Sequence, residues 1–186
     1  MNAHAQQRYR QYKVKDKAAT EQRTIARYMI IVMWIIFLAL LYYGFNEVLQ
    51  QQYNPNQNIN SNIATDANAV VNLKRNKHGH YVASGMINNQ PVVFMLDTGA
   101  SDISVPANIA KQLGLKRGTS QTYQTANGPI ISYLTRLDSV SLGPITLHDL
   151  RASINPNVDN DEILLGMSFL KHLEFTQRGD TLTLRK

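Results

Sequence analysis

The sequence of 186 residues contains no cysteine. This absence excludes a disulfide framework, catalysis by a thiol, and zinc sites built on thiolates. The sequence is also poor in metal-binding patterns. His78-Gly79-His80 has no nearby acid or third ligand, and residues 157–162 lack the glycine and terminal glutamate of a calcium loop. We therefore expect no metal and no cofactor.

A basic face in the main part of the chain is also missing. The formal net charge is +6, but residues 1–27 alone carry seven basic and two acidic side chains. Residues 46–186 hold twelve basic and eleven acidic side chains, so this part is nearly neutral. Binding to nucleic acid needs clustered positive charge. We therefore expect no nucleic-acid partner.

Charged residues are absent from residues 28–45, an apolar run with tyrosines near both ends. Its length suits one bilayer crossing, which needs roughly 17–25 residues, and interfacial tyrosines are typical of such helices. A buried core helix is the alternative, although such helices usually keep a polar face. A cleaved signal peptide fits less well, because no small-x-small cleavage site follows. We predict a transmembrane helix over residues 28–45.

Lysine and arginine crowd the N-terminal side of this run and are absent from residues 46–73. Because basic residues favour the cytosolic side, residues 1–27 are predicted to be a basic cytoplasmic tail. The rest of the chain would then cross the membrane. In a bacterium this places residues 46–186 in the periplasm, held to the inner membrane by a single pass.

Residues 46–68 are rich in asparagine and glutamine and poor in large apolar side chains. Such a segment buries too little surface to offset the entropy of ordering it, so we expect a flexible stalk. The remaining residues, 69–186, have the length of one compact domain.

Short strand patterns dominate residues 69–186, and two helix patterns interrupt them. Hairpins are predicted at the turns 88–90, 127–129, 143–144 and 178–180, where glycine, asparagine or proline separates apolar runs. Short helices are predicted over 107–115 and after the apolar strand that begins at residue 162. The fold class is therefore mainly β, without βαβ alternation.

One apolar strand, residues 91–96, runs directly into a carboxylate at Asp97. Burying an ionised carboxylate is costly unless partners hydrogen-bond to it. The following Thr98, Gly99, Ala100 and Ser101 are all small, so backbone amides and hydroxyls can approach the acid closely. An ordinary strand-ending turn has a similar composition. The apolar run and the added Ala-Ser favour a rigidly held acid.

These residues resemble the active-site loop of the aspartic proteases, in which apolar residues precede Asp-Thr-Gly-Ala-Ser. Downstream, residues 163–170 (ILLGMSFL) resemble the family's apolar-apolar-Gly segment followed by a helix. The resemblance covers roughly residues 74–186 and points to membrane-anchored bacterial members of the single-domain, retropepsin-like branch. It implies a single-lobe acid protease fold with closed, barrel-like sheets, a flap hairpin and a short helix, preceded by the transmembrane helix.

The resemblance also implies a role for each matching residue. Asp97 would be the catalytic acid or base, and Thr98 would brace two loops across a two-fold axis. Gly99 would give its amide to the carboxylates, with Ala100 beside it, and Ser101 would hold the outer oxygen of Asp97. Gly166 would allow close packing beside the loop. In the flap, Ala126, Asn127 and Gly128 would lie over a peptide or protein substrate.

Aspartic protease chemistry needs two facing carboxylates that share one proton. The sequence has one Asp-Thr-Gly, and neither Asp138 nor Asp180 begins a second copy. We therefore expect a homodimer, in which the second carboxylate is Asp97 of another chain. The function predicted is that of a membrane-anchored aspartic endopeptidase. The alternative is a catalytically silent relative that serves as a peptide-binding or scaffold module of the cell envelope.

Overall fold

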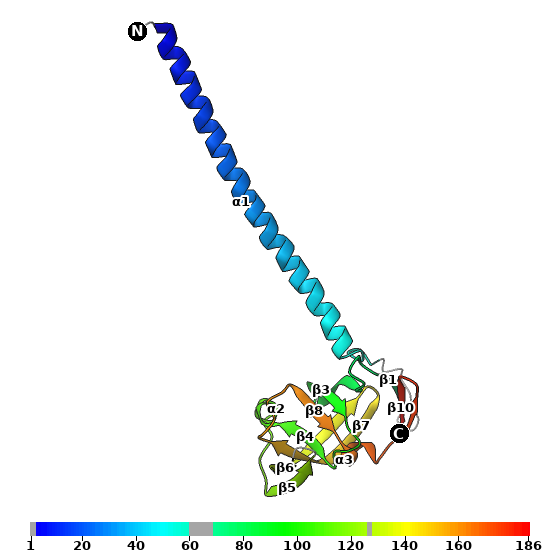
Figure 1. Cartoon of the computed structure of the whole chain (residues 1–186). Helices are drawn as coiled ribbons and strands as arrows, with labels where there is room; N and C mark the ends of the chain where they lie inside the picture. Colours follow the sequence, from blue (N-terminus) through cyan, green and yellow to red (C-terminus); the bar gives the residue numbers. More distant parts are fainter. Residues whose placement is uncertain (1–2, 60–68, 126–127) are drawn as a thin grey trace. The chain divides into compact units, whose positions relative to one another are not determined.

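The structure is a computed structural model that describes residues 3–59, 69–125 and 128–186, with side chains from residue 26 onward (Figure 1). By its internal contacts the chain divides into two units, Met1–Val48 and Leu49–Lys186.

The first unit consists of most of helix α1, which covers Ala3–Tyr53. Within it, Ala26–Tyr53 is long and apolar enough to cross a membrane, judged by length and composition. Large apolar side chains from Tyr28 to Leu49 are exposed. The helix extends beyond the predicted 28–45 at both ends; it contains no proline, and Gly44 does not end it.

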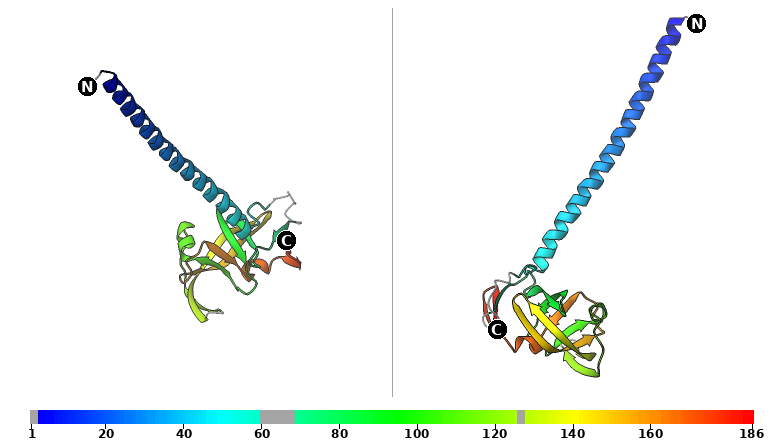
Figure 2. Two further views of the ribbon diagram at one scale, coloured as in Figure 1. Left: turned by 45° about the horizontal axis from the view of Figure 1, so that its top comes forward. Right: turned by 180° about the vertical axis from the view of Figure 1, so that it is seen from behind.

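Six strands of the second unit pair in a closed ring (Figures 1 and 2). Their order around the ring is β2 (Val82–Ile87), β3 (Gln90–Leu96), β8 (Glu162–Leu165), β4 (Ile103–Pro106), β7 (Ile145–Asn155) and β6 (Gly128–Leu142). Pairing of Met86 and Ile87 with Ser141 and Val140 closes the ring. The mainly β, barrel-like fold class is thus confirmed.

Apolar side chains from alternate strand positions fill this ring. The largest of the fully buried ones include Phe94, Leu137, Ile154 and Ile163. Phe169 joins them from the short helix α3 (Met167–Leu170), and helix α2 (Ala107–Gln112) buries Ile109 and Ala110. Strands β3 and β8, whose ends lead to Asp97 and Gly166, thus contribute Phe94 and Ile163 to this core.

All four predicted hairpins form, at turns that contain residues suited to positive φ. Asn88 and Asn89 have φ of 48° and 63° between β2 and β3, and Gly143 has φ of 57° between β6 and β7. Two asparagines in the left-handed region make a turn whose twist matches that of the strands. The hairpin of β5 (Ser120–Thr125) and β6 lies at the position predicted for the flap, although residues 126–127 lie outside the described residues.

A separate three-stranded sheet has the order β1-β10-β9, from β1 (Val70–Lys74), β10 (Thr181–Arg185) and β9 (Glu174–Arg178). The sequence predicted the β9–β10 hairpin but not β1, whose partner lies more than a hundred residues away. Strand β4 was also not predicted. It has only four residues, and its pairing with β7 and β8 is set by tertiary contacts.

The segment from Tyr53 to Asn56 differs from the expected flexible stalk. Asn56 is 7% exposed, and its side chain pairs with the backbone N–H and C=O of Lys74 and the C=O of Val82, at 2.7–2.9 Å. Asn54 donates to Ser84, 3.0 Å away. These asparagines are ordered because the barrel gives their amides partners that composition alone does not reveal. Residues 60–68 of the predicted stalk lie outside the described residues.

We predict that Asn56→Ala destabilises the second unit by about 2 kcal/mol, since it removes the partner of the buried Val82 carbonyl and of the partly buried N–H and C=O of Lys74. Thermal unfolding of the full chain in detergent measures the effect. Asn58→Ala is the matched control, because Asn58 is exposed and has no hydrogen-bond partner among the described residues. Equal melting temperatures for the two variants would contradict this prediction.

Candidate active site

Asp97 lies at the C-terminal end of β3, a strand paired on both sides. Strand β2 runs antiparallel to it and β8 runs parallel to it. The Asp97 amide donates to the Leu165 carbonyl at 3.2 Å, which continues the pairing with β8 to the acid itself. Asp97 is half-buried. Its backbone is therefore fixed by the barrel, while its carboxylate faces an opening.

The loop after Asp97 turns back on the acid. The Gly99 N–H donates to Oδ1 of Asp97 at 2.8 Å, and the Ala100 N–H donates to the Asp97 carbonyl at 3.2 Å. A backbone donor aimed at the carboxylate fixes its orientation. Thr98 and Gly99 are exposed at the tip of the loop, so this tip is accessible to another molecule.

Gly166 holds the opposite side of the loop. A Cβ there would lie 2.5 Å from the Ala100 carbonyl oxygen and closer still to that of Asp102. Just after Gly166, the Met167 N–H donates to the Ala100 carbonyl at 2.8 Å, and the Ser168 N–H donates to the Ser101 carbonyl at 3.0 Å. Only glycine permits this approach, which brings the two sequence motifs into direct contact.

The hydroxyl of Ser101 does not follow the expectation drawn from the resemblance. Its side chain is exposed, and among the described residues it makes no hydrogen bond to Asp97. Within the single chain, the Gly99 amide is the group that holds Oδ1. Of the predicted loop residues, the structure therefore brings Gly99, Ala100 and Gly166 against Asp97 or its loop, whereas Thr98 and Ser101 are exposed beside it.

A cavity of about 560 Å³ lies between the Asp97 loop and the β5–β6 hairpin. Its lining comes from the loop, the hairpin stem and the neighbouring strands. The lining residues are Asp97, Gly99, Ala100, Ser101, Asp102, Ser104, Tyr123, Gln124, Thr125, Ile130, Ser132, Ser153, Asn155 and Leu164. In the hairpin, the Thr125 hydroxyl donates to the Gly128 carbonyl at 2.7 Å, and Gly128 has φ of 104°. The predicted Ala126 and Asn127 lie outside the described residues.

Sequence reasoning missed a polar cluster centred on Asp102, which is 8% exposed. Its Oδ2 accepts hydrogen bonds from the Tyr123 hydroxyl at 2.6 Å and from Nε of Arg151 at 3.0 Å. Arg151 also donates to Gln121 at 2.8 Å. The cluster joins the loop, the hairpin stem and β7. No local signal could reveal it, because the partners lie 21 and 49 residues from Asp102.

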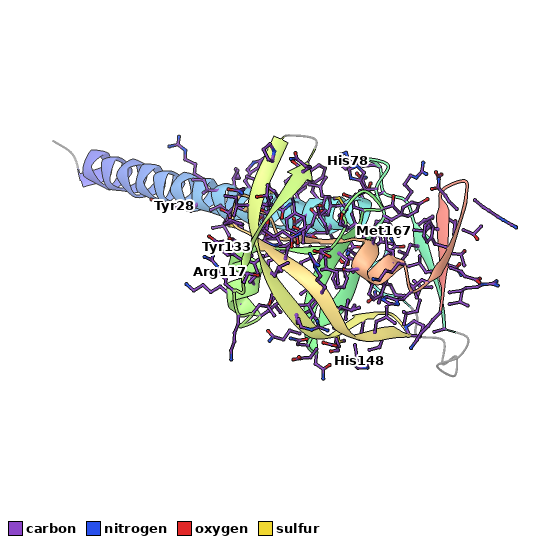
Figure 3. The ribbon with its side chains drawn as sticks, turned by 90° about the horizontal axis from the view of Figure 1, so that it is seen from below. Tyr28, His78, Arg117, Tyr133, His148 and Met167 are labelled. Atoms are coloured by element: carbon purple, nitrogen blue, oxygen red, sulfur yellow. The ribbon has the colours of Figure 1, made fainter. Side chains whose placement is uncertain are left out.

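Burial of the Tyr123 side chain raises the pKa of its hydroxyl above the ordinary value of 10.0, and the hydrogen bond to Asp102 raises it further. The hydroxyl therefore stays protonated, and remains a donor to Asp102, throughout the neutral range. Further along the hairpin, the guanidinium of Arg117 lies 5.1 Å from the centre of the Tyr133 ring (Figure 3).

Histidines and acids do not gather elsewhere. Figure 3 shows His78 and His148 well apart on the second unit, and both side chains are exposed. Across the described ranges, no three His, Cys, Asp or Glu side chains are placed to hold a metal ion. The Asp97 loop and the cavity beside it are therefore the candidate site in the described part of the chain.

Known proteins are similar to the part of the chain that carries this site, which consists of the Asp-Thr-Gly loop, the glycine packed against it and the hairpin over the cavity. A family model described as a gag-polyprotein putative aspartyl protease matches residues 83–172. A crystal structure of a retropepsin-like aspartic protease from Rickettsia conorii matches with 33% identity and a TM-score of 0.54, over 63% of this chain and 91% of that one. The chain belongs to the retropepsin-like aspartic protease family.

Two further bacterial proteins are similar to this retropepsin-like chain over its greater part. An uncharacterized protein in the cobV 5′ region of Sinorhizobium sp. is 30% identical over 172 residues, which cover 88% of this chain and 72% of that protein. An uncharacterized protein of Rickettsia prowazekii is 28% identical over 77% of this chain and 64% of its own length. These relatives extend the likeness to residues before the family model's match.

We predict that Tyr123→Phe lowers the stability of the retropepsin-like unit by about 1 kcal/mol, because it removes a donor to the buried Asp102 carboxylate. A hydroxyl whose pKa is raised on folding stabilises fully below its ordinary pKa and loses this contribution as the pH rises through the folded value. The deficit of Tyr123→Phe should therefore be constant from pH 6 to 9 and shrink above about pH 10.

Thermal unfolding across this pH range measures the difference. Tyr133→Phe is the control in the same hairpin, since the Tyr133 hydroxyl has no hydrogen-bond partner in the part of the chain that the structure describes. A deficit shared by both variants, or one that is unchanged at high pH, would argue against the Tyr123–Asp102 hydrogen bond.

Proposed function

We propose that the protein is a membrane-anchored aspartic endopeptidase whose active site forms between two copies of the chain. The observation that carries the proposal is the orientation of Asp97. It is held by the Gly99 amide at the end of a fully paired strand and faces an open cavity. A carboxylate fixed in this way can remove a proton from a water molecule that attacks a peptide carbonyl.

A second carboxylate is needed to protonate the scissile carbonyl oxygen. Two carboxylates close together cannot both ionise, so one remains neutral and serves as the acid. The sequence contains a single Asp-Thr-Gly, and the barrel is a single lobe. The simplest source of the missing acid is Asp97 of a second copy related by a two-fold axis. The two titrations would then belong to the pair.

The surface around Asp97 supports this pairing. Asp97 and Thr98 border a second cavity of about 390 Å³, whose other lining residues are mostly apolar and include Leu96, Phe175 and Leu184. The Phe175 side chain is 47% exposed. Phe175 lies on β9, which among the described strands pairs only with β10 and so has one free edge. An apolar surface beside a free strand edge favours association with another chain.

The N-terminal helix suits the same scheme. Chains confined to one membrane in one orientation meet at a higher effective concentration than free chains. The excess of basic residues before the helix favours a cytoplasmic N-terminus, with the protease unit in the periplasm and the helix in the bacterial inner membrane. The expected substrates are peptides or proteins accessible on that side, bound as extended strands beneath the hairpin.

We predict that Asp97→Asn lowers kcat/KM on a mixed peptide library by at least about a thousandfold, since an amide can neither accept nor share the proton. Asp138→Asn is the control, because Asp138 is an exposed acid outside the Asp97 cavity. Both variants should unfold at the same temperature as the wild type. Peptide binding by the wild type without any cleavage between pH 4 and 7 would support the silent binding module instead.

We also predict that co-expression of wild-type and Asp97→Asn chains in equal amounts leaves about a quarter of the wild-type activity, because mixed dimers hold one carboxylate. The activity of the mixture, normalised to total chain, is measured against mixing ratio. A shared site gives a quadratic decline. A linear decline would indicate that each chain works alone.

A further inference from the structure

The cavity beside Asp97 has a polar floor, defined here as Ser104, Ser132, Ser153 and Asn155. The residues come from three neighbouring strands, β4, β6 and β7. Ser104 is paired directly with Ser153, and Asn155 lies two residues further along β7, on the same face. Alternate residues of β7, such as Ala152 and Ile154, point into the apolar core. The polar floor is thus the outer face of strands whose inner face is apolar.

Two of these residues have very low exposure, and both line the cavity. Ser132 is 1% exposed and Ser153 is 3% exposed. Among the described residues, neither hydroxyl has a hydrogen-bond partner, and nor does that of Ser104. Buried polar groups in folded proteins are nearly always hydrogen-bonded. Because these serines line a cavity next to the candidate catalytic acid, their missing partners can come from a bound molecule.

Asn155 has a hydrogen-bond partner at one side-chain atom only, among the described residues. Its Oδ1 accepts a hydrogen bond from the Asn157 amide at 2.9 Å, which orients the side chain. The amide nitrogen Nδ2 has no partner among the described residues. The floor therefore presents one oriented amide donor and hydroxyls that can donate or accept.

The charges around the floor narrow the choice of ligand. Asp97 and Asp102 both line the cavity, and the described residues of its lining include no lysine or arginine. An acidic side chain would be repelled there. Asp102 is already paired with Arg151, so its charge is compensated and it offers little to a cationic side chain. Neutral side chains with hydrogen-bonding groups fit these conditions best.

We infer that the polar floor is a substrate subsite for a neutral, hydrogen-bonding side chain, namely that of Ser, Thr, Asn or Gln. This inference rests on the proposed endopeptidase function and adds a substrate preference to it. An apolar side chain of the same size leaves the buried hydroxyls unpaired in the complex. A site built to hydrogen-bond its substrate rejects such a side chain strongly, whereas an apolar pocket discriminates only weakly.

The test uses the full chain in detergent and peptides that place Asn or Leu, two side chains of similar size, at one position at a time around the scissile bond. At one position, the wild type should cleave the Asn peptide at least about tenfold more efficiently by kcat/KM than the Leu peptide. The double variant Ser104→Ala with Ser153→Ala should lower this ratio to near one. Ser153→Thr, which keeps a hydroxyl, should preserve it.

Ser141→Ala is the control, because the Ser141 hydroxyl pairs with Thr146 outside the cavity. Each ratio of kcat/KM for the Asn and Leu peptides is measured within one protein preparation. A lower folded fraction reduces both values equally and does not change the ratio. A wild-type preference for Leu at every position, or a ratio unchanged in the double variant, would overturn the subsite. The inactive Asp97→Asn chain gives a second readout, since its affinities for the two peptides should differ in the same direction. If no peptide is cleaved, the endopeptidase proposal fails, and this binding ratio still decides the subsite.

Discussion

The contact between the Asp97 loop and Gly166 is the constraint on which the rest of the site depends. Two chain segments about seventy residues apart in the sequence meet there with backbone against backbone. The parallel pairing of β3 with β8 brings their ends together, and the absence of a side chain at Gly166 lets the carbonyls of Ala100 and Asp102 lie against it. The carboxylate is thereby positioned by backbone that is paired on both sides, as a preorganised catalytic group requires.

In the proposed dimer, the single chain supplies half of the active site. The barrel of one chain encloses its own apolar core, whereas the tip of the acid loop and Phe175 are exposed. The proposal therefore treats folding of the barrel and pairing of two chains as separate steps. A membrane anchor would act on the second step, because it raises the effective concentration of folded partners and changes none of their contacts.

Much of this fold follows from local patterns in the sequence. The hairpins are predictable because asparagine and glycine tolerate the backbone angles that tight turns need, and the acid loop stands out because a buried strand ends in a carboxylate. What local patterns miss is long-range pairing. Strand β1 has an unremarkable composition and depends on β10, and the ordered Asn54 and Asn56 depend on Lys74, Val82 and Ser84. Asp102 was missed for the same reason, since its partners come from the hairpin and β7.

Asn56 and the polar floor, two of several buried polar groups among the described residues, differ in their hydrogen bonding. At Asn56, every hydrogen-bonding group of the side chain has a backbone partner, so the residue stabilises the fold and has nothing to offer a ligand. On the polar floor, Ser132 and Ser153 are residues of low exposure that line the cavity, and their hydroxyls have no partner among the described residues. A fold has no energetic reason to keep such groups, because alanine would fill the positions at lower cost. Because these serines line the cavity beside Asp97, a substrate side chain can complete the hydrogen bonds that the barrel does not make, which explains hydroxyls at these positions.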